Sequence, residues 1–264
     1  MQDRKLFRSF DNFRLYFDIY EPESSSANEL RPAVVFAFGG GWMDGSVKQF
    51  ADQASALARI GIVSFVPYYR VYERDGTTFE TAMRDYMCFL KYLSDNCESM
   101  RIDRRNIVLA GASAGGQLVL AALLLGNIRW DMAIKGLILF NPVVDTSSTG
   151  YQSPASLNQE FDPQLFSPIH HLNRHLPPSL IFCGTYDSVV PYARLVEFVR
   201  CVQKQGDTAE LVSYSGREHG FFNLRPQNRP EDYEDTLRRC ISFCKQCFSI
   251  SSASASASTS EQSN

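Results

Sequence analysis

The sequence has no long apolar run and no excess of charge of either sign. None of its apolar stretches reaches the roughly 18 residues that a membrane-spanning helix needs, so we expect no membrane association. The 264 residues carry a formal net charge of −3 without a dominant basic patch, which argues against a nucleic-acid partner. The N-terminal stretch MQDRKLFRSF lacks the apolar core of a signal peptide, so the sequence predicts a cytoplasmic location.

The cysteines form neither a disulfide framework nor a metal site. Their number is seven, which is odd, and their spacing is irregular, as is typical of reduced intracellular thiols. Cys244 and Cys247 have CxxC spacing, but they lie late in a helical pattern rather than at the helix N-terminus that redox chemistry requires. No second pair completes a zinc site, so we predict structural cysteines and neither metal nor cofactor.

From residue 33 onward, apolar patterns predict strands that alternate with helices. The continuous run Ala33–Phe38 is typical of a strand covered on both faces, and the almost wholly apolar Leu118–Leu125 is typical of a buried central helix. Residues 6–20 alternate around Asp11-Asn12, which indicates a hairpin. The prediction is one α/β domain over residues 1–248, with a mainly parallel central sheet, an antiparallel N-terminal hairpin and helices on both faces. Further strands are predicted at Ile62–Pro67, Ile107–Ala110, Leu137–Val144, Leu180–Cys183 and Leu211–Tyr214.

Two segments depart from this alternation. Residues 146–178 form a long insertion, rich in Ser, Pro and Asn, after the carboxyl end of a strand. Such insertions usually cover or line a functional site, so we expect this one to lie over the site. Residues 249–264 are a low-complexity Ser/Ala tail, predicted to be disordered and without a catalytic role.

The strongest chemical signal is Gly111-Ala112-Ser113-Ala114-Gly115, between a predicted strand and the buried helix. A GxSxG motif in that context places its serine on a sharp turn, where the hydroxyl projects above the sheet. The positions two before and two after the serine must be small to avoid collision, and both are glycine. The motif predicts Ser113 as a nucleophile.

A serine nucleophile needs a base, and the chain has four histidines. His219 follows the last predicted strand and can lie over the serine, so we assign it as the base. His170, His171 and His175 fall in the insertion and are interpreted as polar surface residues, with lining of the substrate mouth as the alternative.

The base needs an acid that fixes its tautomer. Asp187 lies on the turn after a strand, in the order Ser, Asp, His that this architecture uses. Asp145 also follows a strand, but one strand further from the histidine. We therefore favour Asp187 as the acid and expect Asp145 to bond to loop backbone.

The run Gly39–Gly41 follows an apolar strand and precedes Trp42. Neither GxxxxGK[ST] nor a GxGxxG that opens a helix is present, so a phosphate cradle is disfavoured. Ester attack creates an oxyanion, which preorganised backbone N–H groups stabilise. We expect the glycine loop to supply such groups together with the N–H of Ala114.

These motifs, with Gly-Thr-Tyr-Asp-Ser-Val-Val-Pro, Glu-His-Gly-Phe and SPIHHLNRHLPP, resemble the α/β-hydrolase esterases of the acetyl esterase and hormone-sensitive-lipase-like family. The resemblance spans about Asn12 to Phe248. It implies a serine carboxylesterase that favours short acyl chains. By motif match, the triad is Ser113, Asp187 and His219, and the oxyanion hole is Gly40, Gly41 and Ala114. Trp42 and Asn141 are the predicted substrate-binding residues.

The chain departs from the family pattern at Phe38, where the family usually has a histidine that braces the glycine loop. Another group must therefore hold the loop. The short N-terminus without a helical cap predicts an open site that suits a bulky alcohol, such as an acetylated sugar. The residues leave open an amidase such as an arylformamidase and, less favoured, a non-catalytic ligand-binding protein. They predict no oligomeric state.

Overall fold

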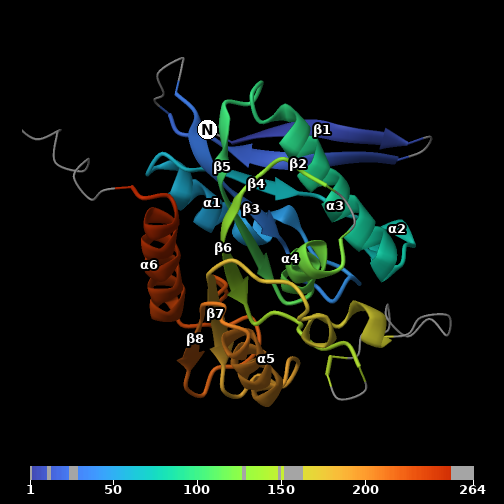
Figure 1. The fold of residues 1–264 in the computed structure, drawn as a ribbon, viewed down its shortest axis with the longest axis vertical. Coiled ribbons are helices and arrows are strands. Elements are labelled where there is room, and N and C mark those ends of the chain that lie inside the picture. The colour runs from blue at the N-terminus through green and yellow to red at the C-terminus, as the bar shows by residue number, and fades with distance from the viewer. Residues whose placement is uncertain are drawn as a thin grey trace, which may run out of the picture.

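The computed structural model describes residues 2–10, 13–23, 29–126, 129–147, 150–151 and 163–250. These residues contain an eight-stranded sheet with strand order β1-β2-β4-β3-β5-β6-β7-β8 (Figure 1). The predicted hairpin turn at Asp11-Asn12, part of the insertion and the tail beyond Ile250 lie outside the described residues.

The sheet has the predicted mixed topology. β2 pairs antiparallel with both β1 and β4, and every other neighbouring pair is parallel. The N-terminal hairpin therefore extends a parallel sheet at one edge. The strands are β1 (Gln2–Phe10), β2 (Phe13–Tyr20), β3 (Arg31–Ala37), β4 (Val63–Pro67), β5 (Ile102–Ala112), β6 (Ile134–Phe140), β7 (Ser179–Gly184) and β8 (Ala209–Tyr214).

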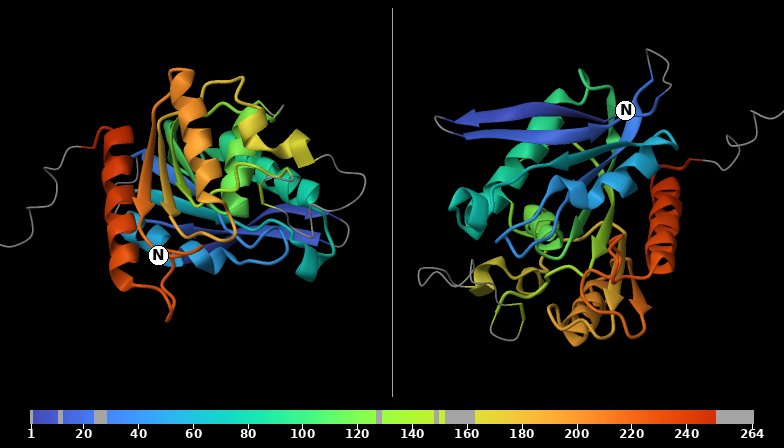
Figure 2. Two further views of the ribbon diagram at one scale, coloured as in Figure 1. Left: turned by 90° about the horizontal axis from the view of Figure 1, so that it is seen from below. Right: turned by 180° about the vertical axis from the view of Figure 1, so that it is seen from behind.

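Helices cover both faces of the sheet. α1 and α6 lie on one face, and α3, α4 and α5 lie on the other (Figures 1 and 2). The helices are α1 (Ala51–Ala58), α2 (Tyr72–Asp75), α3 (Phe79–Asn96), α4 (Ala114–Leu124), α5 (Tyr192–Lys204) and α6 (Pro230–Cys247), with 3-10 turns η1 (Val47–Phe50), η3 (Pro163–Phe166) and η4 (Pro168–His170). No helix in the described ranges is long and apolar enough to cross a membrane.

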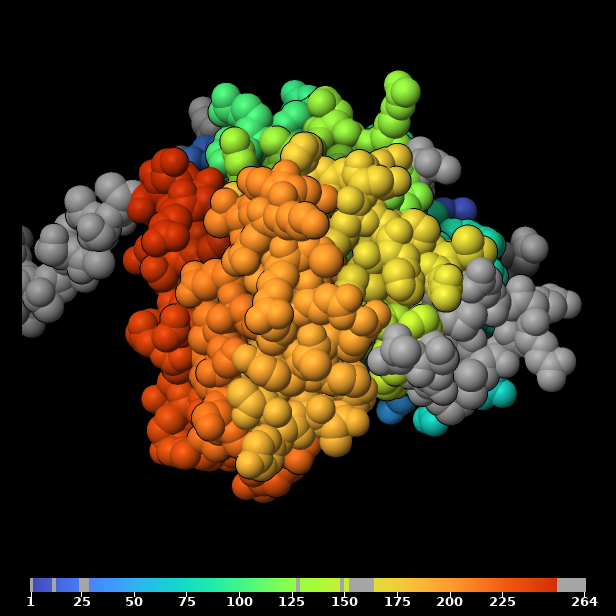
Figure 3. All heavy atoms as spheres, turned by 60° about the horizontal axis from the view of Figure 1, so that its bottom comes forward, coloured from blue at the N-terminus to red at the C-terminus, as the bar shows by residue number. Residues whose placement is uncertain are grey.

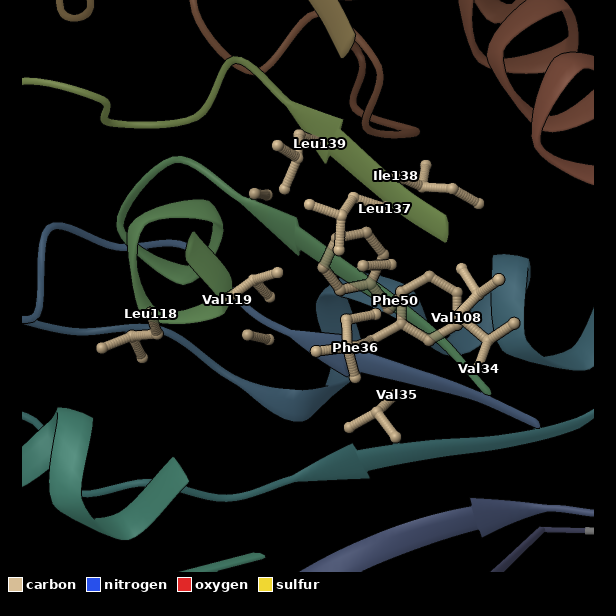
Figure 4. Packing of buried hydrophobic residues seen from close by; sticks show 14 of the residues in the cluster. Val34, Val35, Phe36, Phe50, Val108, Leu118, Val119, Leu137, Ile138 and Leu139 are labelled. Atoms are coloured by element: carbon tan, nitrogen blue, oxygen red, sulfur yellow. The ribbon is translucent and has the colours of Figure 1, made fainter. Parts of the chain in front are cut away.

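The core forms on both sides of the sheet because successive strand residues point to opposite faces. Phe36 of β3 stacks on Phe50, beside α1, with ring centroids 4.7 Å apart. Val35 points to the opposite face, on which α4 lies, and both Val35 and Leu118 of α4 are fully buried (Figure 4). All ten residues from Ala114 to Leu124 other than Leu123 are buried, as the apolar composition of this helix predicts.

One predicted strand is too long. β6 ends at Phe140 rather than at Val144, because Asn141 has a φ of +36°, which is incompatible with an extended strand. Val143 then donates its N–H to the carbonyl oxygen of Ser113 at 3.0 Å instead of to a neighbouring strand. Val143 and Val144 are buried although they lie outside the sheet. Because they are apolar and follow the strand directly, the sequence pattern wrongly extended the strand to include them.

The described part of the insertion lies beside α5, where Figure 3 shows it in yellow next to the orange helix. Gln117 of α4 donates to the Phe166 carbonyl oxygen at 2.9 Å, and Ile169 donates to that of Val144 at 2.9 Å. These bonds fix residues 163–171 to the end of the sheet at which β5 and β6 terminate.

Candidate active site

Ser113 occupies the tight turn that joins β5 to α4. Its φ of 51° and ψ of −119° are strained for a residue with a side chain. A Cβ on Gly111 would lie 2.5 Å from the Gly115 carbonyl oxygen, and one on Gly115 would lie 2.1 Å from that of Ala37. Both flanking glycines are therefore required by the packing of the turn, as the motif predicts.

His219 lies in the loop between β8 and α6, and its ring reaches Ser113. The Nε2 atom is 3.0 Å from Ser113 Oγ, and Nδ1 is 2.8 Å from Asp187 Oδ2. Because a carboxylate only accepts, Nδ1 carries the proton and donates to Asp187, which leaves Nε2 able to accept from the serine hydroxyl. The structure brings these three predicted residues together in one hydrogen-bonded chain.

Asp187 is held by the turn that follows β7. Its Oδ1 atom accepts the backbone N–H groups of Val189 at 2.9 Å and Val190 at 2.8 Å. The carboxylate is fully buried as a side chain, whereas the His219 ring is 21% exposed. One oxygen is thus fixed by the turn and the other is presented to His219.

The rival acid, Asp145, serves a different purpose. It accepts from Arg194 Nε at 2.8 Å, from the Ser147 N–H at 2.8 Å and from the Ser167 hydroxyl at 2.9 Å. Burial alone would raise the pKa of this carboxyl, but the bonds from Ser147, Arg194 and Ser167 hold it well below its usual range. Asp145 ties the insertion to α5, and within the described part of the chain it makes no bond to His219.

The other three histidines lie away from Ser113. His171 Nε2 is 3.1 Å from the Gln164 carbonyl oxygen, and the exposed His175 places Nδ1 2.6 Å from Asp207 Oδ1. None of the three lines the cavity beside Ser113. Their interpretation as polar surface residues agrees with these positions.

Asn141 lines the cavity beside Ser113 but directs its amide at the histidine loop. Its Oδ1 accepts the Gly220 N–H at 3.2 Å, and its Nδ2 lies 3.4 Å from His219 Nε2. Asn141 therefore positions His219, and because it lines the cavity its contact with substrate stays a prediction.

Trp42 does not line this cavity and is 1% exposed. Its positive φ of 60° directs the ring into the core, edge-on to Phe79 at 4.7 Å between centroids. The prediction that Trp42 contacts substrate is not supported by this position. The contact is inferred from its place beside the glycines, and it stays a prediction.

The glycine loop is braced by Tyr69 and Gln49. The Tyr69 hydroxyl donates to the Phe38 carbonyl oxygen, and the two rings stack with centroids 3.9 Å apart. Gln49 Oε1 accepts the Gly39 N–H at 2.6 Å. Burial raises the pKa of Tyr69 well above its ordinary value, so the hydroxyl stays protonated and can donate. These contacts take the place of the histidine that the family pattern has at Phe38.

The glycine loop forms a tight turn with no room for a Cβ atom at Gly40. The Gly40 carbonyl oxygen accepts the N–H groups of Met43 at 3.0 Å and Asp44 at 3.1 Å. Gly40 has a φ of 130°, and a Cβ there would lie 2.1 Å from the Asp44 carbonyl oxygen. A Cβ on Gly39 would lie 3.3 Å from that of Ser113, which places the loop directly beside the turn of β5 and α4.

The brace makes a testable contribution to catalysis. In Tyr69→Phe we expect kcat for p-nitrophenyl acetate to fall about tenfold with little change in KM, because a displaced loop stabilises the oxyanion less well. The matched control is Tyr86→Phe, since Tyr86 is equally buried and its hydroxyl has no partner among the described residues. Equal losses of kcat in both variants would show that Tyr69 is structural only.

A cavity of about 450 Å³ opens beside Ser113, between η1 and α1 on one side and the loop before α6 on the other. The reacting end is formed by Gly39, Gly40, Ser113 and His219. Most of the residues in the remaining wall have polar side chains. The wall includes Asp44, Lys48, Gln49, Asp52, Gln53, Asn223 and Arg225, with Phe222, Leu224 and Tyr233 as apolar members.

Sequence reasoning missed Tyr69, Gln49 and the positioning role of Asn141. The first two act on the loop from 31 and 10 residues away, and no local motif marks them. The position of Asn141 in the sequence could have indicated its role. A polar residue directly after a strand lies at the edge of the sheet where Ser113 and His219 also lie.

Cysteine reactivity and metal binding both depend on which side chains lie close together. All seven cysteines are free, and burial raises the pKa of Cys247 to about 11, which removes it as a reactive thiol at neutral pH. In the part of the chain that the structure describes, no group of three or more His, Cys, Asp or Glu side chains could hold a metal ion.

Comparisons with known proteins agree with this fold. Residues 17–149 match the family model BD-FAE. The apo structure of Thermogutta terrifontis esterase 2 is 31% identical, with a TM-score of 0.83, over 92% of this chain and 94% of that one. An esterase of Fusarium pseudograminearum is 29% identical over 74% of this chain and 67% of its own length. The Arabidopsis thaliana isoprenylcysteine alpha-carbonyl methylesterase is 28% identical, and the match covers 54% of its length.

The sheet, the serine turn and these relatives define an α/β-hydrolase-fold enzyme, a serine hydrolase that acts on carboxylic esters. The predicted resemblance to α/β-hydrolase esterases is therefore confirmed. Within this class, the chain belongs to the BD-FAE family.

Proposed function

We propose that the protein hydrolyses short-chain esters, above all acetyl esters, of polyhydroxylated alcohols such as sugars. The observation that carries this proposal is a cavity with many polar side chains in its wall, beside a hydrogen-bonded Ser113–His219–Asp187 chain. The nucleophile is Ser113, the base is His219 and the acid is Asp187.

Acylation begins when Ser113 Oγ attacks the carbonyl carbon of the ester and its proton passes to His219 Nε2. The negative charge that develops on the carbonyl oxygen is stabilised by backbone N–H groups of Gly40, Gly41 and Ala114. Ala114 opens α4, where N–H groups have no acceptor within the helix and the helix dipole favours an anion. Collapse of the intermediate breaks the ester C–O bond, and His219 gives its proton to the leaving alcohol oxygen.

Deacylation repeats these steps with water. His219 takes a proton from the water as it attacks the acyl carbon, and then returns the proton to Ser113 Oγ as the acid product leaves. Asp187 keeps Nδ1 protonated and stabilises the imidazolium in both halves.

The side on which the alcohol lies follows from the proton transfer. Because His219 protonates the leaving oxygen, the alcohol lies next to Nε2, on the side of the cavity that His219 lines. Gln53 lines the same cavity and is 3% exposed, and no donor in the described part of the chain reaches its Oε1. A substrate hydroxyl would supply that hydrogen bond, whereas an apolar alcohol would leave a buried acceptor unpaired.

Support for a short acyl chain comes from relatives. The Thermogutta esterase 2 structures include propionate-bound and butyrate-bound forms, and others in which that protein is phosphoramylated by tabun. The covalent organophosphate adduct of that relative supports a nucleophilic mechanism for this chain.

The proposal is tested with p-nitrophenyl acetate, butyrate and octanoate, and with acetylated xylo-oligosaccharides. We expect kcat/KM to fall at least about tenfold from acetate to octanoate, because each methylene that the site cannot accommodate costs binding energy. Gln53→Met should lower kcat/KM for the acetylated sugars several-fold more than for p-nitrophenyl acetate. Fastest turnover of octanoate, or faster cleavage of N-formylkynurenine than of any acetyl ester, would contradict the proposal and favour a lipase or an arylformamidase.

We also propose that the protein acts in the cytoplasm. The seven free cysteines, several of them buried, suit a reducing compartment. Cell fractionation followed by activity measurement tests this location, and activity confined to the secreted fraction would contradict it.

A further inference from the structure

A second hollow, of about 370 Å³, adjoins the cavity beside Ser113. Ser46 and Lys48 belong to the walls of both. The remaining walls come from β1, β2 and the segment Tyr68–Asp75, which includes α2. Figures 1 and 2 show the turn end of the β1–β2 hairpin and α2 at the same side of the molecule. A substrate seated at Ser113 can therefore extend past Ser46 into this hollow.

The alternation of β2 builds one wall. Leu15 and Phe17 point into the core and are fully buried, so the residues between and beside them point to the opposite face. That face presents Arg14, Tyr16 and Asp18 to the hollow. The polar side of the hairpin thus faces residues 46–48 and the segment Tyr68–Asp75 across the hollow.

The hollow contains four cationic and two acidic side chains, but both carboxylates are already bonded within the protein. Asp18 accepts from Arg4 at 2.6 and 3.0 Å, and it is 2% exposed. Asp75 accepts the Tyr68 hydroxyl at 2.8 Å and the Val71 N–H at 2.9 Å. Asp75 also lies 3.5 Å from Arg74 Nε, so each acid already has a cationic partner within the protein.

Two of the four cations remain for a ligand. Arg4 pairs with Asp18, and Arg74 lies over the Tyr68 ring at 4.4 Å and donates to the Gly45 carbonyl oxygen at 3.1 Å. Arg14 and Lys48, in contrast, form no ion pair with any acid in the described ranges. Both are exposed and line the hollow together.

We propose that this hollow is an anion subsite that binds a carboxylate on the alcohol part of the substrate, through Arg14 and Lys48. The proposal rests on the proposed ester hydrolysis at Ser113 and specifies its substrate class further, as acetylated oligosaccharides that carry a uronate. The guanidinium of Arg14 matches the planar carboxylate, and Lys48 adds a mobile point charge. Tyr16, which also lines the hollow, supplies aromatic surface for the sugar ring that bears it.

The test compares kcat/KM for an acetylated oligosaccharide with a uronate substituent and for its neutral counterpart. In the wild type we expect the acidic ester to be preferred, and the preference to shrink in 0.5 M NaCl because salt screens exposed charges. In Arg14→Gln/Lys48→Gln, the ratio of acidic to neutral kcat/KM should fall about tenfold. The matched control, Arg200→Gln/Lys204→Gln on the exposed side of α5, removes the same charge and should keep the wild-type ratio.

A binding measurement separates this subsite from the proposed reaction. Calorimetry with the uronate-bearing oligosaccharide and the Ser113→Ala protein should show binding that weakens about tenfold when Arg14 and Lys48 are also replaced by Gln. Weakened binding without turnover by the wild type would overturn the proposed function and keep the subsite. An unchanged ratio and unchanged binding in the double variant, or an equal loss in the control, would overturn the subsite.

Discussion

Ser113→Ala is expected to lower kcat for p-nitrophenyl acetate by at least about 10⁴-fold, because no other group takes over nucleophilic attack. The methyl side chain fits the turn without a clash, since it lacks only the oxygen that faces His219. KM should change little, because the cavity walls and the glycine loop remain in place.

The residual rate of this variant is informative. Binding and the oxyanion donors alone give some acceleration over water, so a small activity is expected to remain. A variant that is folded, as judged by circular dichroism and thermal melting, and that retains more than about a tenth of the wild-type kcat would exclude Ser113 as the nucleophile.

Asp187→Asn should lower kcat by about 10⁴-fold while the fold is kept. The N–H groups of Val189 and Val190 hold the oxygen that remains in the amide, so the new NH₂ group faces His219 Nδ1. That group donates, and Nδ1 must then accept, which moves the ring proton to Nε2. A histidine protonated at Nε2 cannot take the proton of Ser113.

Asp145→Asn is the matched control for this prediction, because both carboxylates follow a parallel strand and are buried. Loss of the Arg194 ion pair should lower the melting temperature. In contrast, kcat should stay within about tenfold of the wild type, since the bonds that the described residues make to Asp145 come from Arg194, Ser147 and Ser167 and not from His219. A larger loss of kcat in Asp145→Asn than in Asp187→Asn would reverse the assignment of the acid.

The sequence predicts the residues of the hydrogen-bonded chain well because each one follows a parallel strand. Ser113, Asp187 and His219 come after β5, β7 and β8, and the carboxyl ends of parallel strands meet at one edge of the sheet. The strict need for small residues around the serine is likewise visible in Gly111 and Gly115.

What the sequence could not show depends on contacts between distant segments. Tyr69 and Phe38 meet only because β3 and β4 are neighbours, and nothing local marks a tyrosine as a loop brace. The side to which Trp42 points depends on a backbone turn with a positive φ, which the glycines permit but do not specify. The anion subsite combines β2 with the start of η1, and a sequence pattern does not show that these elements adjoin.

The most direct test of the account is the site of covalent modification by the organophosphate paraoxon. Trypsin should release Asn106–Arg129, in which Ser113 is the single side chain with a hydroxyl, thiol or amine. We expect complete inhibition with one diethylphosphoryl group on this peptide, and no adduct in His219→Gln, where the base is lost. Inhibition with the adduct on any other peptide, or full hydrolysis of acetyl esters by a protein with Ser113 phosphorylated, would contradict the mechanism.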